Sequence, residues 1–543
     1  MEGKNKYQLV VLNIEKHDII KLDGTTTTYY TKRGSDIMRI ILNKNSSVPM
    51  YLQIRNQMRD MILEGILEPG FRLPSERKLA ETLGVNRSTV LNAYRDLKAD
   101  DLIGSHIGKG TVVIMPPIPI NRDRMPQKVS KLPWTQLLGE CALRMQQPLV
   151  SDILKTANRK DVISFAAGFL AQTHDPVEEL LEAQSRLLKD YGSTMLQYSA
   201  TQGYLPLRES ITDLMQKRGI KAGPEEIIVL SGSQQAIDLT ARIFIDPGDV
   251  VIVEEPSFFS ALQVFQSVGA KIMSVPIDSN GMRIDFLESL LSRVKPKLIY
   301  TIPTFQNPSG TVMNIKRRRQ LLDIAYKYQI PILEDDPYGE LRYDGDHLPT
   351  LKALDQHGYV IYASTFSKIM FPGMRIGWVV AEREVIRQFV LAKQMADLHT
   401  NTLGQWIMDD FLRSNVFAKR LKTVIGENIE SRNLMIKALK QYAVEGFEWQ
   451  VPEGGLYIWC HLPQQVDTER LIVKAEEKKV VFVPGKIFYS GYVESNTIRL
   501  SFSSPPKRLI NTGIRLLMEA VKEIIEEEKV NHYLGNDEIK PIL

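Results

Sequence analysis

The feature that most constrains the fold is a regular alternation of short apolar runs and helical segments between about residues 134 and 526. The apolar runs include EIIVLS, DVVIVEE, KLIYTIP, IPILEDD and YVIYASTFS. Strands that alternate with helices in this way form a largely parallel sheet with helices on its faces. Near residue 400 the pattern changes to longer helices and a few strands, such as LYIWCHL and TIRLSFS. We therefore predict an α/β domain that ends in a smaller α+β subdomain.

A different pattern fills residues 48–115, where a compact helical segment is followed by a short hairpin. Three helical periods follow one another, and Gly84 allows a tight turn between the second and the third. Ser75 precedes the second helix and Asn86 precedes the third, and both residue types are favoured helix caps. This spacing predicts a winged helix-turn-helix, mostly α with a small β wing.

The third helix of that segment carries polar and basic residues on its outer face. In a helix-turn-helix, such groups reach base edges and phosphates in the major groove of DNA. The residues in question are Asn86, Arg87, Ser88, Thr89 and Asn92. The alternative is a small helical domain with ordinary solvated arginines. The net charge of +4 permits nucleic-acid binding but does not argue for it.

A chain of 543 residues is too long for one core, so several folded units are expected. A proline-rich stretch, VIMPPIPINRDRMPQKVSKLP, favours an extended connector between the two patterned regions. Met38 starts the first segment that reads as ordered, so the residues before it are expected to be poorly ordered or not part of the natural start. The predicted divisions are an N-terminal extension (1–46), the winged helix-turn-helix (47–115), a linker (116–150), the α/β domain (151–530) and a C-terminal tail (531–543).

Composition excludes several classes of protein. No apolar run approaches the length of about 18 residues that suggests a membrane-spanning helix. The N-terminus lacks the apolar core and cleavage site of a signal peptide. Cys141 and Cys460 make no metal or disulfide framework. We therefore expect a cytoplasmic protein with no membrane partner and no metal site.

Lys368 follows an apolar strand in the run ASTFSKIMFPGMRIGW, at a strand end where α/β sheets place their ligands. Thr365 and Ser367 precede it, and Arg375 follows with a guanidinium that can pair with a phosphate. A lone lysine is usually a solvated surface residue. The combination of this lysine with the following GMRIG is rarely accidental and indicates a binding site.

Other strand ends carry residues suited to the same site. Gly232, Ser233 and Gln234 place backbone N–H groups at a helix N-terminus, which binds anions. A second group offers a strand-end acid (Asp335, with Asp336 as the alternative), an amide (Asn307), a phenol (Tyr338), a stacking ring (Phe258) and a carboxylate-binding guanidinium (Arg499). Each piece alone has an ordinary structural explanation, such as a helix start, a core aromatic or a surface arginine. Their joint order along the chain is what indicates function.

Over about residues 160–510 this order closely resembles fold-type I, aspartate-aminotransferase-like enzymes, especially the 2-aminoadipate and kynurenine aminotransferases. The resemblance implies pyridoxal 5′-phosphate (PLP) as cofactor, with Lys368 as the Schiff-base and catalytic lysine and Asp335 against the pyridinium nitrogen. It implies that Asn307 and Tyr338 bind the phenolic oxygen, that Phe258 stacks on the ring and that Arg499 binds a substrate or effector carboxylate. The implied phosphate site is formed by Gly232, Ser233, Gln234, Thr365, Ser367 and Arg375.

Two further points depend on the same resemblance. Tyr198 matches a tyrosine that reaches the phosphate of the neighbouring subunit, which implies a homodimer with shared sites. Members of the family usually carry a Gly-Gly-x-Pro-like stretch where this chain has FAAGFLAQTHDP. That loop borders the substrate in relatives, so the identity of the substrate or effector stays open.

The residues PSERxLA and STVxxAYxxL over about 48–114 closely resemble the GntR family of winged-helix repressors. The resemblance implies DNA contacts from Arg72, Ser75, Arg77, Asn86, Arg87, Ser88, Thr89 and Lys109. A GntR-type domain joined to an aminotransferase-like domain resembles the MocR subfamily. It implies a PLP-dependent transcriptional regulator that binds a double-stranded operator and senses PLP, an amino acid or an amine.

The alternative is an active PLP-dependent aminotransferase with an attached DNA-binding domain, because an intact PLP site serves both sensing and turnover. Whether the chain is an enzyme therefore stays open. A third interpretation is a sensor of PLP that controls vitamin B6 supply and has no amino-acid effector.

Overall fold

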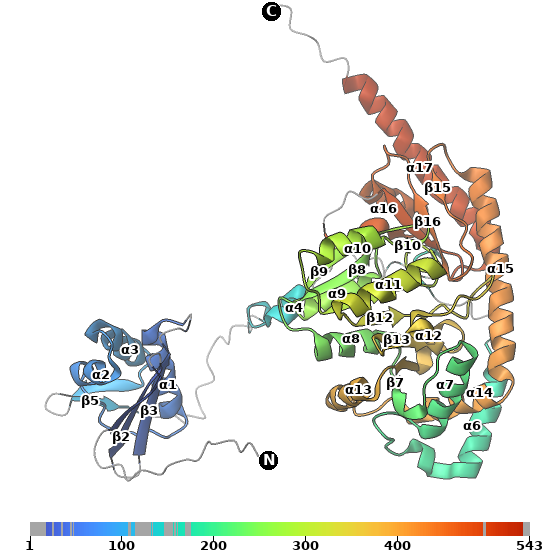
Figure 1. Ribbon diagram of the computed structural model, residues 1–543. Coiled ribbons are helices and arrows are strands. Elements are labelled where there is room, and N and C mark those ends of the chain that lie inside the picture. Colours follow the sequence, from blue (N-terminus) through green and yellow to red (C-terminus); the bar gives the residue numbers. More distant parts are fainter. Residues whose placement is uncertain are drawn as a thin grey trace, which may run out of the picture. The chain divides into compact units, whose positions relative to one another are not determined.

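The computed structural model describes residues 18–23, 26–33, 36–43, 46, 48–106, 110–114, 132, 134–145, 156, 159, 161–168, 175–491 and 496–535 (Figure 1). The chain forms two compact units, residues 1–132 and residues 133–543. We call the first unit the head and the second unit the body. Within the described residues, none of the helices combines the length and the apolar character needed to cross a membrane.

The head contains the winged helix-turn-helix that the sequence predicts. Its helices are α1 (Met50–Leu63), α2 (Glu76–Leu83) and α3 (Arg87–Ala99), and its wing strands are β4 (Ile103–His106) and β5 (Gly110–Val113). Gly84 ends α2 in the left-handed conformation with φ of 63°, which glycine adopts without steric cost. Leu79, Val90 and Tyr94 are fully or almost fully buried between the helices.

The N-terminal extension differs from the prediction, because much of it is built into the head. Strands β1 (Asp18–Asp23), β2 (Thr26–Arg33) and β3 (Asp36–Asn43) form an antiparallel sheet in the order β1-β2-β3. Met38, Ile40 and Leu42 of β3 are buried in the same core as the three helices. The alternation of apolar residues in MRIILN was the signal for this strand, and its partner strands carried no comparable signal.

Two glutamines of α1 close the outer edge of β3. The Gln57 side chain accepts a hydrogen bond from the backbone N–H of Ile41 at 2.9 Å and donates one to its carbonyl oxygen at 2.8 Å. The Gln53 side chain likewise accepts a hydrogen bond from the backbone N–H of Asn43 at 3.0 Å and donates one to its carbonyl oxygen at 3.1 Å. These amides occupy the backbone groups that a neighbouring strand would otherwise pair with.

The body contains an eight-stranded sheet in the order β10-β9-β8-β11-β12-β13-β14-β7. The strands are β7 (Ile227–Leu230), β8 (Val250–Glu255), β9 (Lys271–Asp278), β10 (Gly281–Met282), β11 (Leu298–Thr301), β12 (Ile332–Asp335), β13 (Val360–Thr365) and β14 (Gly377–Val380). Neighbouring pairs from β9 to β13 are parallel, whereas β14 runs antiparallel to both of its neighbours. The sheet is therefore largely parallel, as predicted, and β7, β11, β12 and β13 are buried along their whole length.

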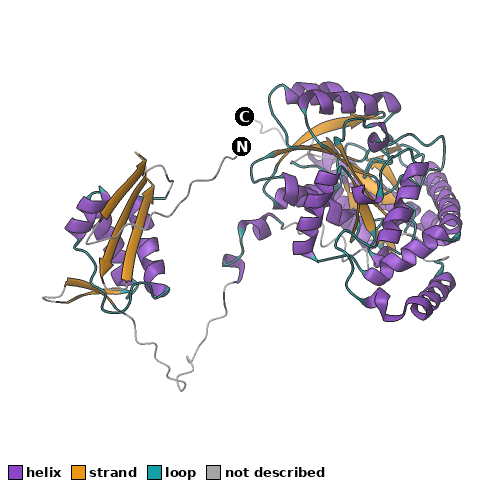
Figure 2. Cartoon of the chain, turned by 60° about the horizontal axis from the view of Figure 1, so that its bottom comes forward, coloured by secondary structure: helices purple, strands orange, loops and turns teal. Residues whose placement is uncertain are grey.

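Helices surround this sheet (Figure 2). They are α6 (Val177–Tyr191), α7 (Leu205–Lys217), α8 (Ser233–Phe244), α9 (Phe259–Ser267), α10 (Ile284–Leu291), α11 (Ile315–Tyr328), α12 (Leu351–Leu354), α13 (Arg383–Ala396) and α14 (Thr402–Arg413). Separate apolar clusters pack against the sheet, so it forms the centre of the body's core.

The C-terminal part is the predicted α+β subdomain. Its four-stranded antiparallel sheet has the order β15-β16-β19-β18, with β15 (Glu448–Trp449), β16 (Tyr457–His461), β18 (Val483–Pro484) and β19 (Thr497–Ser501). A short parallel pair joins β6 (Ile163–Ser164) to β17 (Val480–Val481). Its helices are α15 (Val416–Tyr442), α16 (Thr468–Glu477) and α17 (Lys507–Gly535), of which α15 and α17 are long.

Two predicted boundaries fall elsewhere in the structure. Helix α4 (Glu140–Arg144) lies in the predicted linker but belongs to the body, where Arg144 Nε donates a hydrogen bond to the carbonyl oxygen of Ser267 at 3.2 Å. Helix α17 continues to Gly535, into the predicted tail. Helix α4 is too short to show apolar periodicity, and the last turns of α17 (KVNHYLG) are too polar to show it.

Candidate functional site

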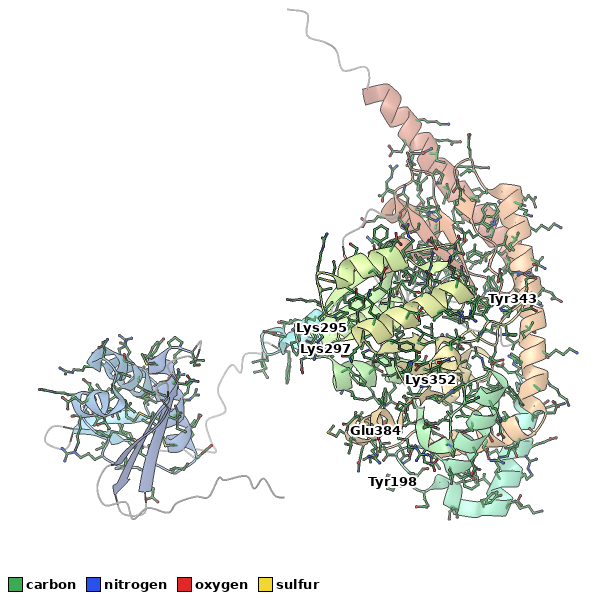
Figure 3. All side chains as sticks on the ribbon, viewed as in Figure 1. Tyr198, Lys295, Lys297, Tyr343, Lys352 and Glu384 are labelled. Carbon is green, nitrogen blue, oxygen red and sulfur yellow. The ribbon has the colours of Figure 1, made fainter. Side chains whose placement is uncertain are left out.

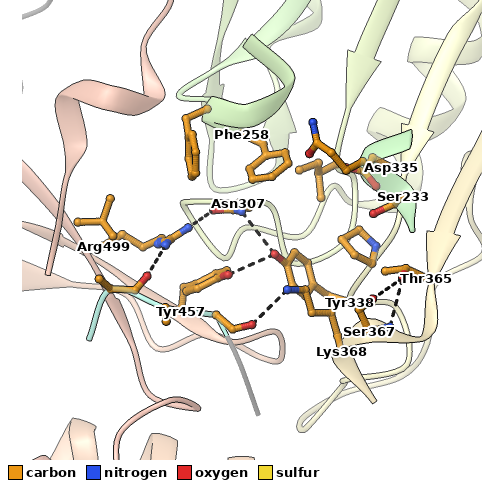
Figure 4. A pocket seen from close by; sticks show the side chains of 18 of the residues that line it. Ser233, Phe258, Asn307, Asp335, Tyr338, Thr365, Ser367, Lys368, Tyr457 and Arg499 are labelled. Carbon is orange, nitrogen blue, oxygen red and sulfur yellow. Dashed lines mark hydrogen bonds between the residues drawn. The ribbon is translucent and has the colours of Figure 1, made fainter. Parts of the chain in front are cut away.

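A cavity of about 240 Å³ opens in the body, lined by residues that follow several strands of the large sheet and by residues of the small sheet (Figure 4). Most of the predicted site residues line this one cavity: Ser233, Gln234, Phe258, Asn307, Asp335, Tyr338, Thr365, Ser367, Lys368, Arg375 and Arg499. They come from segments up to 266 residues apart in the sequence, from Ser233 to Arg499. The fold therefore gathers these residues at the carboxyl ends of the large sheet's strands, where such sheets bind ligands, and Arg499 joins them from β19 of the small sheet.

Lys368 ends the short helical turn that follows β13. Thr365 begins this turn, and its hydroxyl accepts a hydrogen bond from the backbone N–H of Ser367 at 3.2 Å. The half-buried Lys368 reaches across the cavity, where its Nζ donates a hydrogen bond to the carbonyl oxygen of Gly168 at 3.1 Å. The only side-chain amine among the described cavity-lining residues is therefore held in a defined place.

Asp335 ends β12 and is almost completely buried. Tyr300 donates a hydrogen bond to its Oδ2 at 2.9 Å, while Oδ1 has no partner. Burial raises the pKa of Asp335 to about 7, although the hydrogen bond from Tyr300 and the Lys368 cation lower it. A basic ring nitrogen placed at Oδ1 would restore the ionised carboxylate.

Asp336 turns away from the cavity, which favours Asp335 over this alternative. Arg218 pairs with Asp336 Oδ2 at 2.7 Å, and the Tyr362 hydroxyl donates to the same atom at 3.0 Å. The buried cation already neutralises this carboxylate, so no charge is left for a ligand.

Residues suited to an anion also line the cavity. Ser233 and Gln234 begin α8, whose N-terminal N–H groups attract negative charge. Gly232 precedes them with φ of 93°, and a Cβ there would lie 2.4 Å from Arg375 Nη2. Arg375 Nη1 donates a hydrogen bond to Ser367 Oγ at 3.2 Å. Gly232 does not itself line the cavity, but its lack of a side chain makes room for the arginine that does.

Asn307 connects the two sheets at the cavity. Its Nδ2 donates a hydrogen bond to the Tyr338 hydroxyl at 3.4 Å, and its Oδ1 accepts one from Arg499 Nη1 at 2.8 Å. Arg499 Nη2 donates to the carbonyl oxygen of Ala166 at 2.8 Å. The guanidinium is therefore fixed in orientation, while its buried Nε has no partner.

Tyr457 is a cavity residue that the sequence analysis missed. Its ring lies beneath the guanidinium of Arg499, 4.0 Å from the centroid, and its hydroxyl accepts a hydrogen bond from Tyr338 at 3.5 Å. Burial alone would raise the pKa of Tyr457, but the Arg499 and Lys368 cations bring it below the usual value. The signal was the alternation of aromatic residues in LYIWCHL, where Tyr457 and Trp459 share one face of β16.

Tyr198 does not line the cavity of its own chain. Its side chain lies at the surface of the body (Figure 3) and is 85% exposed, with its ring edge-on to His399 at 5.6 Å. Its role at the phosphate of a neighbouring subunit stays a prediction.

The predicted DNA-contacting residues of the head lie on or near α2 and α3. Their side chains are exposed, apart from half-buried Thr89: Arg72, Ser75, Arg77, Asn86, Arg87, Ser88 and Thr89. Ser75 also caps α2 by accepting from the backbone N–H of Lys78 at 3.3 Å. Asn86 occupies the N-cap position of α3 but makes no side-chain cap hydrogen bond, contrary to our expectation. Lys109, in the predicted wing, lies outside the described residues.

The cavity residues fit PLP. Buried polar atoms usually have hydrogen-bond partners, and among the described cavity-lining residues the buried side-chain atoms without one are Asp335 Oδ1 and Arg499 Nε. A pyridinium nitrogen would satisfy the first, and the carboxylate of an amino compound would satisfy the second. The α8 N-terminus and Arg375 suit a phosphate, and Lys368 supplies the amine that such a cofactor needs.

The fold and the site define a PLP-binding domain of the kind found in enzymes. A helix-turn-helix domain precedes it in the chain. The model of aminotransferase class I and II matches residues 160–515, and that of the bacterial regulatory proteins of the gntR family matches residues 50–113. The chain belongs to the class I and II aminotransferase family and carries a GntR-type DNA-binding domain in front of it. PLP is its cofactor.

Relatives of both kinds are found. The chain is 41% identical to aromatic-amino-acid aminotransferase 1 of Thermococcus litoralis over 72% of its own length and 95% of that protein. It is 31% identical to the uncharacterized HTH-type transcriptional regulator YisV of Bacillus subtilis, over 89% of its length and 98% of that protein. Among solved structures, LysN, the α-aminoadipate aminotransferase of Thermus thermophilus complexed with N-(5′-phosphopyridoxyl)-L-leucine, matches with a TM-score of 0.69. That match has 35% identity and covers 73% of this chain and 100% of LysN.

Proposed function

We propose that this protein is a PLP-dependent transcriptional regulator that binds a double-stranded DNA operator through its head and senses PLP or an amino compound through its body. The observation that carries the proposal is the presence of both parts on one chain, since a plain aminotransferase has no use for a helix-turn-helix. The match to YisV, which extends across both parts, supports it. A cytoplasmic location is part of the proposal, because the protein has to reach DNA.

The cavity residues have separate roles in this proposal. When bound, PLP supplies an electron sink that stabilises negative charge on the carbon next to an amino group. Lys368 would hold the cofactor covalently and give way to the amino group of the effector. Asp335 would keep the ring nitrogen protonated, Arg499 would bind a carboxylate, and the groups around Ser233 and Arg375 would bind the phosphate.

Sensing requires that ligand binding change DNA affinity. An effector shifts the equilibrium between two arrangements of the protein only if it binds one of them better than the other. We propose that the regulator is a homodimer in which Tyr198 enters the partner's site. Its 85% exposed ring and its absence from the cavity of its own chain support this role.

The second candidate is an active aminotransferase with a DNA-binding head. It is favoured by the presence of most of the predicted PLP-site residues in one cavity and by the 41% identity to an aromatic-amino-acid aminotransferase. In that case Lys368 would also carry a proton between the carbon atom that gives up the amino group and the carbon atom that receives it.

The test is a DNA-binding titration of the PLP-loaded protein against its own upstream region, at fixed salt and with competitor DNA, with and without single amino acids. Competitor and salt control matter because phosphate contacts dominate non-specific affinity. We expect specific binding that one compound alters, and loss of that response in Lys368→Ala. A response that survives in Lys368→Ala contradicts sensing through this lysine. No specific binding, together with steady amino-group transfer to 2-oxoglutarate, supports the aminotransferase.

A further inference from the structure

We propose that Lys393 and Asp397, an ion pair outside the cavity, hold the phosphate-binding segments in place and so determine how strongly the body prefers a phosphorylated cofactor to an unphosphorylated one. Both are positioning residues, because neither is among the described residues that line the cavity. The inference rests on the proposed function in one respect, that the phosphate of PLP lies at the N-terminus of α8 and Arg375. It is the same for a regulator and for an aminotransferase.

Lys393 lies in the last turn of α13, the helix that packs against α8. Its side chain is completely buried, and lysine is almost never fully buried without a partner. Its Nζ donates hydrogen bonds to both carboxylate oxygens of Asp397, at 2.8 and 3.0 Å, and to Gln235 Oε1 at 3.0 Å. All three donors of the ammonium group are therefore used, and one carboxylate neutralises its charge.

Asp397 connects this lysine to the turn that begins α8. It follows the last residue of α13, and its side chain is 33% exposed. Ser231 Oγ donates a hydrogen bond to Asp397 Oδ2 at 3.2 Å, and Gln235 Nε2 donates one to the same oxygen at 2.9 Å. Burial alone would raise the pKa of Asp397, but the hydrogen bonds from Lys393 and Gln235 bring it below the usual value. The carboxylate is therefore ionised when it holds the turn.

Ser231 is the point at which these contacts reach the phosphate-binding groups. Its backbone N–H donates to Gln235 Oε1 at 2.8 Å, and its carbonyl oxygen accepts a hydrogen bond from Arg375 Nη2 at 3.1 Å. Gly232, with φ of 93°, connects it directly to Ser233, the first residue of α8. A shift of Ser231 would therefore move both the guanidinium of Arg375 and the N-terminal N–H groups of the helix.

The phosphate depends on these groups more than the rest of the cofactor does. Several donors stabilise a phosphate fully only when all of them point at it at once, and displacements of about 0.5 Å reduce the gain. Lys368 and Asp335, which suit the rest of the cofactor, follow β13 and end β12. A displaced turn therefore weakens the binding of PLP and spares that of pyridoxal, the same compound without its phosphate. A general loss of packing would weaken both.

The first experiment measures the dissociation constants of PLP and of pyridoxal for the full-length, cofactor-free protein, from the change in cofactor absorbance. The test variant is Lys393→Met/Asp397→Ala, which removes both charges together and leaves no uncompensated buried charge. We expect its PLP affinity to fall about 10- to 100-fold and its pyridoxal affinity to change by less than about threefold. The ratio of the pyridoxal constant to the PLP constant therefore falls. Thermal unfolding of each variant shows whether it is folded.

Arg413→Met/Asp409→Ala is the matched control. Arg413 Nε and Asp409 Oδ1 also form an ion pair between residues four positions apart, at 2.8 Å on α14. Neither is among the described residues that line the cavity. We expect this variant to keep the ratio of dissociation constants of the unchanged protein.

A smaller change decides the question if the pair variant does not fold. Ser231→Ala removes only the hydroxyl that donates to Asp397, and we expect PLP affinity to fall about 3- to 10-fold with pyridoxal affinity unchanged. Ser231→Thr keeps a hydroxyl, and we expect it to restore most of the loss. Equal losses in the two variants overturn the inference.

Arg375→Ala separates this inference from the proposed function on which it rests, because it removes part of the phosphate site itself. If Arg375→Ala leaves the ratio unchanged, the phosphate lies elsewhere, and the proposed site and this inference are both overturned. If Arg375→Ala lowers the ratio and the pair variant does not, the inference alone is overturned. Equal weakening of PLP and pyridoxal by the pair variant also overturns it. A lower ratio in both variants and an unchanged ratio in the control support it.

Discussion

The hydroxyl of Tyr300 donates a 2.9 Å hydrogen bond to Oδ2 of Asp335, on the neighbouring strand of the large sheet. Both residues are buried, and the other carboxylate oxygen lacks a partner. Tyr300 therefore fixes the plane of the carboxylate and leaves Oδ1 for a ligand. It is a positioning residue that the sequence did not reveal, because a tyrosine in the run KLIYTIP looks like ordinary strand core.

We predict that Tyr300→Phe weakens PLP binding roughly 10- to 100-fold, the equivalent of a lost hydrogen bond to a charged group. The phenylalanine ring fills the same space, so packing is kept. Equilibrium dialysis of PLP measures the effect. Tyr326→Phe is a matched control, because Tyr326 makes a 2.9 Å hydrogen bond to Asp355 on a part-buried site outside the cavity. Equal affinities of the two variants would contradict the positioning role.

The pH dependence of PLP binding follows from the pKa of Asp335, which is about 7 in the cofactor-free protein because of burial. Below pH 7 the carboxyl holds a proton that must leave before the carboxylate can pair with a pyridinium. Asp335 alone should therefore tighten PLP binding by up to roughly tenfold between pH 6 and pH 8. The comparison is with Asp335→Asn, which shares every other titrating group. The prediction fails if both proteins show the same pH profile.

The same raised pKa predicts that the stability of the cofactor-free protein falls as pH rises, whereas PLP binding tightens. The pKa of an aspartate carboxyl is near 4 in the unfolded chain and about 7 for Asp335 in the folded protein. The resulting contribution to the free energy of unfolding is fully present below pH 4 and is lost as pH rises through about 7. At pH 8 the cofactor-free protein should therefore unfold at a higher temperature as Asp335→Asn than unchanged. Calorimetry of both proteins at pH 5 and pH 8 checks this, and a larger gain at pH 5 would contradict it.

In the head, Arg87 begins α3 and pairs with Glu76 at 3.4 Å, although its side chain is 70% exposed. Such an ion pair contributes little by itself, so Arg87 is free to exchange Glu76 for a phosphate. We predict that Arg87→Ala weakens DNA binding and lowers its salt dependence by about one phosphate contact. Arg95→Ala is the control, since Arg95 is 73% exposed and lies about 12 Å further along the same helix. Similar losses for both would indicate non-specific charge alone.

Sequence reasoning predicted most of the site because its residues follow strand ends. Lys368, Asp335 and Asn307 each stand after an apolar run, and parallel strands bring such positions together. Tyr457 and Tyr300 were missed because their roles depend on register between strands, which single-sequence patterns do not specify. The choice between Asp335 and Asp336 depended on Arg218, a residue 117 positions before Asp335 that no local pattern connects to it.

The fold was predicted where apolar periodicity is strong and missed where it is weak. The helix-turn-helix and the parallel strands have regular apolar spacing, and both were found. Strands β1 and β2 read as DIIKLD and TTTYYTKR, where threonine and charged residues hide the alternation. β2 takes its place by pairing with β3, whose inner residues are buried against the helices, and β1 takes its place by pairing with β2.

The hydrogen bonds of Gln57 to β3 predict that this side chain protects the strand from opening. We predict that Gln57→Leu speeds amide hydrogen exchange in residues 36–43 of the full-length protein, because the Ile41 N–H loses its 2.9 Å partner. Asn56→Leu is the control, since Asn56 is exposed on the same helix and its side chain contacts only Arg55 among the hydrogen bonds of the described residues. Unchanged exchange in Gln57→Leu would show that the sheet does not depend on this amide.

The position of Gln53 and Gln57 also bears on how the protein behaves when it is concentrated. An uncovered edge strand recruits strands from other molecules and starts aggregation. Here two side chains from the first helix of the DNA-reading domain take up that edge, so the added sheet can be carried without its β3 edge becoming a nucleus for self-association. The sheet of the extension and the first helix of the head are therefore joined at Ile41 and Asn43 by the same hydrogen bonds that cover the strand edge.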